Sequence, residues 1–372
     1  MISSKEQTAP LQPLSTTDKW IDNLNIEAFR QEIYNLGQEL LKNQGPNDLA
    51  HLHKMIWWSD SLTFFGLILT PFLPVWSLLP AVLLAFGVTS RWTMIAHHTC
   101  HGGYDKSGDT RFNRFRFGVG SIWRRVLDWC DWMLPEAWNV EHNQLHHYKL
   151  GEDTDPDLVE RNMTALRAPG SLLTKYLSVA FIISTWKWWY YAPNTYQCLR
   201  MVETRRTNPT LLQKEKKRLG ADGLKQPLVF TTLITEAVSG CFSKSYQKTS
   251  LLPKFVSLSG FMGRVMLPFV LYRFIVLPML PIAIAYGFGL IHKSNLVSAF
   301  LTSIGHFVLA DLIANIHSFV IIGTNHCGND LYRFDTPCTF GSGTFYLRQI
   351  ISSTNFTAGT DLIGKIKVIH TF

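Results

Sequence analysis

The sequence lacks several patterns that mark secreted and exported proteins. Its six cysteines form no CxxC pair and no compact secreted framework, so we expect reduced thiols. The first 20 or so residues contain no apolar signal-peptide core and no arginine, so neither a cleaved secretory signal nor an organellar transit peptide is expected. No internal repeat is present.

Charge is also scarce in three long stretches of the chain. Residues 61–90 carry no charged side chain, which is enough for one bilayer crossing of about 20 residues. Pro71, Pro74 and Pro80 interrupt this stretch, so a hairpin of two short crossings fits as well. Residues 265–291 and 296–323 predict two further crossings. These hydrophobic stretches favour one membrane-embedded unit over several soluble domains.

The polar segments have different expected places. Residues 25–53 have the spacing of an amphipathic helix, residues 97–170 are expected outside the membrane, and residues 171–192 in its interface. The net charge of +8 comes largely from a segment that we interpret as a cytosolic loop beside an anionic leaflet. No nucleic-acid partner is expected, because aromatic residues do not alternate with these cations. The cations are Arg200, Arg205, Arg206, Lys214, Lys216, Lys217, Arg218 and Lys225.

Histidine, by contrast, is concentrated in two clusters. Residues 97–101 read HHTCH and residues 142–147 read HNQLHH, so six of the 13 histidines fall within about 51 residues. If both segments are α-helical, His97 and His101 lie on one face, as do His142 and His146, with His147 beside them. The residue after His97 is His98, not the glutamate of a zinc protease. Six imidazoles exceed the needs of one zinc, which indicates more than one metal, and two irons fit dioxygen activation.

Other polar residues are candidates for the same site. Two crossings return the chain to the side that it left, so His326 is expected on the face that carries the clusters. The acidic run 152–157 either orients the imidazoles through hydrogen bonds or caps a loop; Asp153 and Asp157 are its candidates. Three ionisable residues inside the last predicted crossing serve either a structural contact or a substrate channel: His306, Asp311 and His317.

The motifs together resemble the membrane fatty acid desaturase family. The resemblance is carried by HHTCH, EHNQLHHY, NIHSF and NHCGNDLYRFD between apolar segments, and it runs from about residue 56 to residue 363. We therefore divide the chain into a polar lead-in (1–55), a desaturase-like domain (56–363) and a divergent tail (364–372). The resemblance implies an all-α, multi-pass helical membrane protein whose cytosolic helical cap carries the histidine boxes.

The resemblance also implies a reaction and a ligand set. It implies two iron ions, dioxygen as co-substrate, and insertion of a double bond into an acyl lipid or acyl-CoA within a membrane. The ligands it implies are His97, His101, His142, His146, His147 and His326, with His98 as a further candidate. Because no HPGG haem motif is present, electrons are expected from a separate donor. Cytochrome b5 would place the protein in the endoplasmic reticulum, which we favour, and ferredoxin in a plastid or bacterial membrane.

One expected motif is missing. The family carries a third box of HxxHH or QxxHH type, whereas residues 356–372 contain His370 alone. We therefore expect low or no activity from the 372-residue form. Two alternatives share the same features: a histidine-box hydroxylase or oxygenase of lipids or carotenoids, and a catalytically dead membrane protein that binds lipid or a partner.

Overall fold

The computed structural model describes residue 21 and residues 23–129, 134–158, 169–242, 250–326, 331–334 and 336–353. Among these residues every regular element is helical, and the isolated β-bridge between Glu152 and Phe334 is the β contact that they contain. The expected all-α fold is confirmed. Short π-helical and 3-10 turns, labelled η, continue or link the α-helices.

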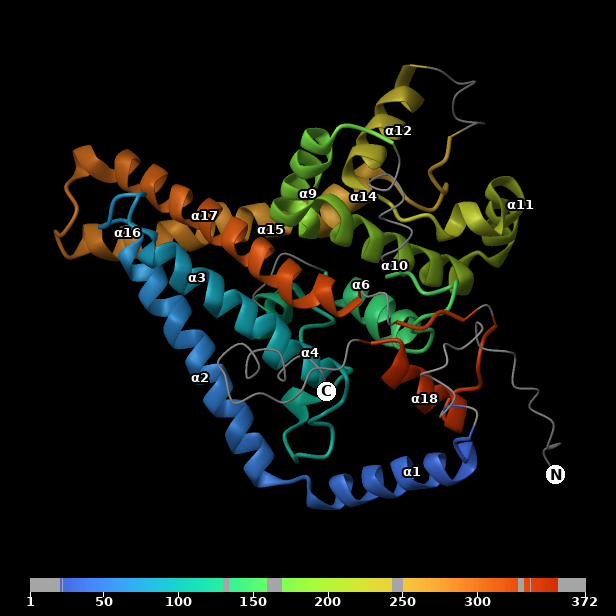
Figure 1. The fold of residues 1–372 in the computed structure, drawn as a ribbon. Helices are drawn as coiled ribbons and strands as arrows, with labels where there is room; N and C mark the ends of the chain where they lie inside the picture. The colour runs from blue at the N-terminus through green and yellow to red at the C-terminus, as the bar shows by residue number, and fades with distance from the viewer. Residues whose placement is uncertain are drawn as a thin grey trace.

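The elements follow one another along the chain (Figure 1). The first part contains α1 (Ile26–Asn43), α2 (Pro46–Leu69), α3 (Leu78–Ser90), η1 (Arg91–Ala96), α4 (His97–Cys100), η2 (Thr110–Phe112), α5 (Ile122–Arg124), η3 (Arg125–Trp129), α6 (Pro135–Trp138) and η4 (Asn139–His146). The middle contains α9 (Leu172–Trp186), η5 (Lys187–Tyr191), α10 (Ala192–Thr207), α11 (Pro209–Lys225) and α12 (Phe230–Phe242). The last part contains α14 (Leu258–Phe261), η6 (Met262–Met266), α15 (Leu267–Leu271), η7 (Tyr272–Val276), α16 (Leu277–Gly287), η8 (Lys293–Asn295), α17 (Leu296–Ile322), η9 (Gly323–His326) and α18 (Gly343–Ile351).

Three continuous helical segments among the described residues are long and apolar enough to cross a membrane. They are Leu78–Cys100, Leu258–Gly287 and Lys293–Ile322. The second and third overlap the crossings predicted from hydropathy. The first begins only at α3, because the chain turns at residues 70–77 instead of running straight through residues 61–90. The stretch therefore forms a hairpin of α2 and α3, of which α3 belongs to a candidate membrane span; two short crossings stay a prediction.

Small residues allow α2 and α3 to pack closely in this hairpin. A Cβ atom on Gly66 would lie 2.9 Å from Leu84 Cγ, so only glycine fits there without movement. On the facing side, the Ser59 hydroxyl donates a hydrogen bond of 2.8 Å to the Gly87 carbonyl. Close approach of helix backbones at small residues is the usual way in which helices associate in membranes.

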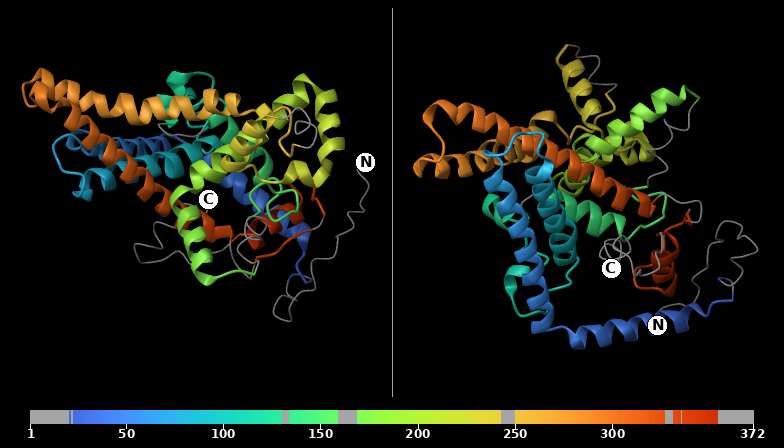
Figure 2. Two further views of the ribbon diagram at one scale, coloured as in Figure 1. Left: turned by 90° about the horizontal axis from the view of Figure 1, so that it is seen from above. Right: turned by 60° about the vertical axis from the view of Figure 1, so that its left-hand side comes forward.

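The hairpin of α16 and α17 lies beside the hairpin of α2 and α3, and both turn at the same end (Figures 1 and 2). His306 on α17 connects the two hairpins, since its Nε2 lies 2.9 Å from the carbonyl oxygen of Leu73 in the turn between α2 and α3. The opposite ends of α3 and α17 therefore also lie on one side of the molecule. These ends lead into His97 and His326.

The basic segment interpreted as a cytosolic loop is helical, and its position beside a membrane stays a prediction. It folds into α10, α11 and α12. Asn208 begins α11 by accepting a hydrogen bond of 3.0 Å from the Leu211 amide, and Pro209 occupies the first helical position. Leu212 and Leu224 are buried in the core, which the count of charges did not reveal.

The interfacial segment predicted at residues 171–192 forms α9 and η5. The first half of α9 exposes apolar side chains, with Leu172 and Tyr176 each 70% exposed. An apolar exposed face suits the predicted interfacial position, which stays a prediction. The expected boundary between residues 55 and 56 falls inside α2, and residues 364–372 lie outside the described part of the chain.

Candidate metal centre

The first histidine cluster ends the helix that begins with α3. His97 starts α4, and the His101 amide donates a hydrogen bond of 3.0 Å to the His97 carbonyl, so the two imidazoles lie one turn apart with ring centroids 4.6 Å apart. The helix ends at Gly102, whose φ of +85° is a left-handed conformation that favours glycine. The side chains of His97 and His101 therefore point to the same side of the helix.

The second cluster lies on a π-helix, η4, which changes which histidines align. The His147 amide donates to the carbonyl of His142, five residues earlier, at 3.0 Å. His142 and His147 are therefore the aligned pair, whereas α-helical spacing had paired His142 with His146. His146 instead faces a separate set of side chains.

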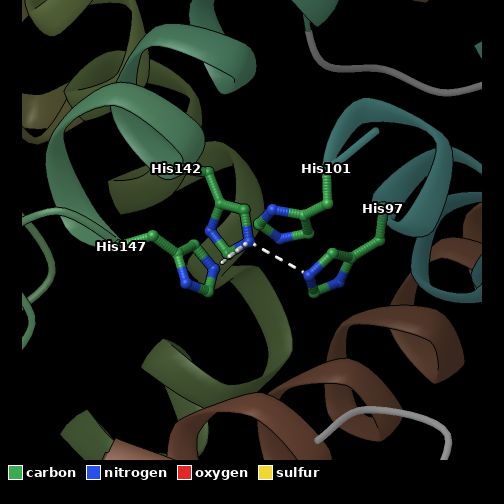
Figure 3. Close-up of side chains that lie close together, drawn as sticks. All are labelled: His97, His101, His142 and His147. Atoms are coloured by element: carbon green, nitrogen blue, oxygen red, sulfur yellow. Dashed lines mark hydrogen bonds between the residues drawn. The ribbon is translucent and has the colours of Figure 1, made fainter. Parts of the chain in front are cut away.

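Four imidazoles form a first group, His97, His101, His142 and His147, whose candidate ligand atoms all lie within 4.8 Å of one another. Two come from the end of the α3 segment, and two come from η4 and the residue that follows it; the two pairs face each other across a small space (Figure 3). His142 Nε2 lies 3.2 Å from His97 Nε2 and 3.1 Å from His147 Nε2. A neutral imidazole carries one proton, so His142 cannot donate from Nε2 to both neighbours. A cation shared by these nitrogens would satisfy the whole group.

The surroundings of this group lower the pKa values of three of its imidazoles. Burial, and then the neighbouring imidazoles, hold the pKa values of His142 and His147 well below their ordinary value. Burial and the nearby His98 and His146 lower the pKa of His101 to about 4. Neutral imidazoles offer a lone pair to a metal without first losing a proton.

A second group contains His146, Asp157 and His326, with ligand atoms again within 4.8 Å. The rings of His146 and His326 lie 5.0 Å apart, so the end of the α17 segment reaches the same site as η4. Although burial opposes its charge, the carboxylate of Asp155, 2.8 Å from Nδ1, raises the pKa of His146 to about 9. Burial, with the charge of His146, lowers the pKa of His326 to about 3.

The remaining predicted residues lie elsewhere. His98 and Asp153 belong to neither group, and Asp153 is exposed, with its amide 3.3 Å from the Phe334 carbonyl. Asp311 pairs with Arg273, not with His306, and His317 packs against Phe86 at 5.2 Å between ring centroids.

A cavity of about 240 Å³ is present, and none of the three predicted channel residues of α17 lines it. Its lining is Ile122, Arg125, Val126, Pro268, Phe269, Leu271, Tyr272 and Val276. Residues 356–372, where a third box was expected, lie outside the described residues.

Several neighbours of the two groups were not singled out from the sequence. Trp138 stacks on His142, with ring centroids 4.3 Å apart. The side-chain amide of Asn143 donates a hydrogen bond of 3.0 Å to the Cys100 carbonyl, and this bond connects the two clusters. Glu141 is fully buried and accepts a hydrogen bond of 3.1 Å from the Tyr191 hydroxyl; burial raises the pKa of this carboxyl well above its ordinary value. Asp155 belongs to the acidic run 152–157, but the candidates named from the sequence were Asp153 and Asp157.

Comparison with known proteins yields one match. The model of a family described as fatty acid desaturase matches residues 73–346, a range that contains both histidine groups. No curated protein and no solved structure matches the chain.

Proposed function

The chain belongs to the fatty acid desaturase family, and from this premise we propose that it is a di-iron desaturase, an enzyme type that introduces a double bond into an acyl chain, with low or no activity in the 372-residue form, in which residues 356–372 contain His370 alone. The family implies an oxidoreductase that acts on lipid. The observation that carries the proposal is the pair of adjacent ligand groups, one of four imidazoles and one of two imidazoles and a carboxylate. Each group is assembled from segments far apart in the sequence.

The donor atoms fit iron. Imidazole is a common ligand of iron, and two imidazoles with one carboxylate form the facial set used by non-haem iron oxygenases. Iron bound in this way supplies activation of dioxygen for the removal of hydrogen from an unactivated carbon. The chain's own contribution is to hold the imidazoles in place, with Asp155 orienting His146 and Trp138 packed on His142.

The substrate, donor and location follow from the same proposal. The three apolar helical segments support a multi-pass membrane protein, whose substrate is an acyl lipid or acyl-CoA. A separate protein, cytochrome b5 or ferredoxin, would deliver the electrons. We favour the endoplasmic reticulum, with a plastid or bacterial membrane as the alternative.

Iron content tests the proposal. Protein purified in detergent and loaded with Fe²⁺ should bind two ions per chain, and His97→Ala and His146→Ala should each reduce the content, because each removes a ligand of a different group. His292→Ala is the control, since this exposed histidine contacts Ser294 and belongs to neither group. Equal iron content in all four proteins would refute the proposal.

Mass spectrometry of the lipid product then separates the possible reactions. Loss of two hydrogens identifies a desaturase, whereas gain of oxygen would identify a hydroxylase or oxygenase. Lipid binding that survives both histidine substitutions, with no iron in the wild type, would indicate a binding protein.

A further inference from the structure

The turn that follows the second histidine cluster is held by a segment close to the C-terminal end of the described chain. The Phe334 amide donates to the Gly151 carbonyl at 2.9 Å, and the Phe334 carbonyl accepts from the Asp153 amide at 3.3 Å. Gly151 has φ +76°, and a Cβ there would lie only 2.6 Å from Ser352 Oγ. The two segments are therefore in backbone contact, with no room for a side chain at residue 151.

Arg348 on α18 fixes the same turn by a buried ion pair. Its Nη1 lies 3.2 Å from Glu152 Oε1 and donates to the Thr336 carbonyl at 2.7 Å. Glu152 Oε1 also accepts from the Cys338 amide at 3.1 Å. The two side chains are only 8% and 6% exposed. A buried charge that loses its partner is strongly destabilising, so Glu152 cannot keep this position once the guanidinium is removed.

The next residue, Gln349, reaches the histidine cluster itself. Its Nε2 donates to the carbonyl of His147 at 3.0 Å. Further along the held turn, Asp155 accepts from the amides of Gly151 at 3.3 Å and Asp157 at 2.9 Å, and contacts His146 Nδ1 at 2.8 Å. Arg348 thus holds the turn that carries Asp155 and Asp157, and Gln349 contacts His147 of the first group.

We propose that Arg348 and Gln349 are positioning residues for the two metal positions. Gln349 sets His147 through its carbonyl, and Arg348, through Glu152, sets the turn that carries Asp155 and Asp157. The inference rests on the proposed function, since it concerns the ligands of that site. Neither residue belongs to a ligand group, so both act through other residues.

The position of α18 is itself set by the N-terminal helix. A Cβ on Gly343, the first residue of α18, would lie 2.3 Å from the Ile26 carbonyl oxygen, so α1 and α18 meet backbone to backbone. Ile21, Phe334, Leu347 and Ile351 form a small apolar cluster beneath this contact. Rigid support of this kind lets a residue outside the ligand set control metal geometry.

Titration with Co²⁺ tests the inference, because its visible spectrum reports ligand geometry without turnover. We expect Arg348→Ala to weaken the second metal position by about 10- to 100-fold and change its spectrum, as loss of such supporting contacts does elsewhere. Arg348→Lys should restore much of the affinity, since an ammonium group can still reach Glu152. Gln349→Met, which removes only the amide donor, should perturb the first position and leave the second unchanged.

Arg218→Ala is the matched control. Like Arg348, Arg218 pairs with a glutamate and donates to a backbone carbonyl. Its Nη2 lies 2.5 Å from Glu215 Oε2 and donates to the Leu252 carbonyl at 2.8 Å. Arg218 lies on α11 and not on α18. This variant should lose thermal stability without any change in Co²⁺ affinity or spectrum. Wild-type affinity and spectrum at the second position of Arg348→Ala would overturn the inference.

Hydrogen exchange of the metal-free proteins separates this inference from the proposed function. The amides of residues 151–157 should exchange faster in Arg348→Ala than in the wild type or in Arg218→Ala. If the wild type bound no metal, the proposed function would fail, and this exchange would still decide whether Arg348 holds the turn. Unchanged exchange would show that it does not.

Discussion

Asp155 is the residue on which the charge of the second group depends. It lies against His146 and is the main reason why that imidazole has a raised pKa, while burial alone would lower it. Asp157 and Glu141 also raise this pKa, and the rings of His142, His147 and His326 lie beside His146. In the metal-free protein His146 therefore holds its proton at neutral pH, whereas His142 and His147 of the first group do not.

This contrast predicts different pH dependence at the two metal positions. A metal must displace the proton of His146, so affinity at the second position should rise by up to about tenfold per unit above pH 7 and level off near pH 9. Affinity at the first position should be flat over this range, because the pKa values of His142 and His147 lie well below it. Co²⁺ titration at several pH values measures both.

Asp155→Asn provides the discriminating variant. Without the carboxylate, the pKa of His146 falls, so the rise of affinity with pH should flatten. Asp153→Asn, an exposed neighbour outside both groups, should behave as the wild type. The same steep pH dependence in Asp155→Asn would contradict this account.

At the scale of elements, α17 joins the apolar helices to the site. Its Asp311 accepts hydrogen bonds from Arg273 of η7 at 3.1 and 3.3 Å, and the two side chains are 4% and 3% exposed. The Arg273 guanidinium also lies 4.8 Å from the centre of the Phe307 ring. This pair fixes the rotation of α17 relative to the α15 to α16 segment, and with it the direction in which His326 leaves the helix.

Replacing one member of this pair should destabilise the protein more than replacing both members. Asp311→Leu or Arg273→Met alone should cost about 3–5 kcal/mol, since each leaves a buried charge without its partner, whereas the double variant should cost clearly less. Thermal unfolding in detergent measures the cycle. Arg30→Ala, which breaks the exposed pair with Glu27 on α1, is the control and should change little. Additive losses in the double variant would rule out this role for the pair.

The same scale shows what the sequence could predict. Hydropathy located α17 and the α14 to α16 segment, because long apolar runs need no knowledge of partners. It left the course of residues 61–90 open, since Pro71 and Pro74 fit a turn between helices as well as a distorted crossing. The basic residues around Lys214 concealed α11, which buries Leu212 and Leu224.

At the scale of the whole molecule, the site joins three parts of the chain: the end of the α3 segment, the η4 region and the end of α17. The sequence predicted that these parts meet, because two crossings bring His326 back to the side of the clusters. It did not predict how the histidines divide between two groups. That division depends on the π-helical hydrogen bond from His147 to His142, which α-helical periodicity cannot represent.

Metals bound at the two groups would together link all three parts and should stabilise the folded protein as a whole. At a free concentration of 100 times Kd, binding at one position adds about 2.7 kcal/mol. Fe²⁺ should therefore raise the unfolding temperature of chelator-treated protein. The combined His97→Ala and His146→Ala variant should show little of this shift, and an equal shift in wild type and variant would mean that the metal stabilises the protein from another place.

The π-helix of the second cluster has a consequence for insertions and deletions. Three residues separate His142 from His146, and the wider winding of η4 places His147, instead of His146, above His142. A chain with one codon fewer between these histidines could recover the same alignment with ordinary α-helical winding. Gain or loss of a codon at this point can thus be absorbed by a change in helix pitch, so the spacing of such a motif can drift while its geometry is kept.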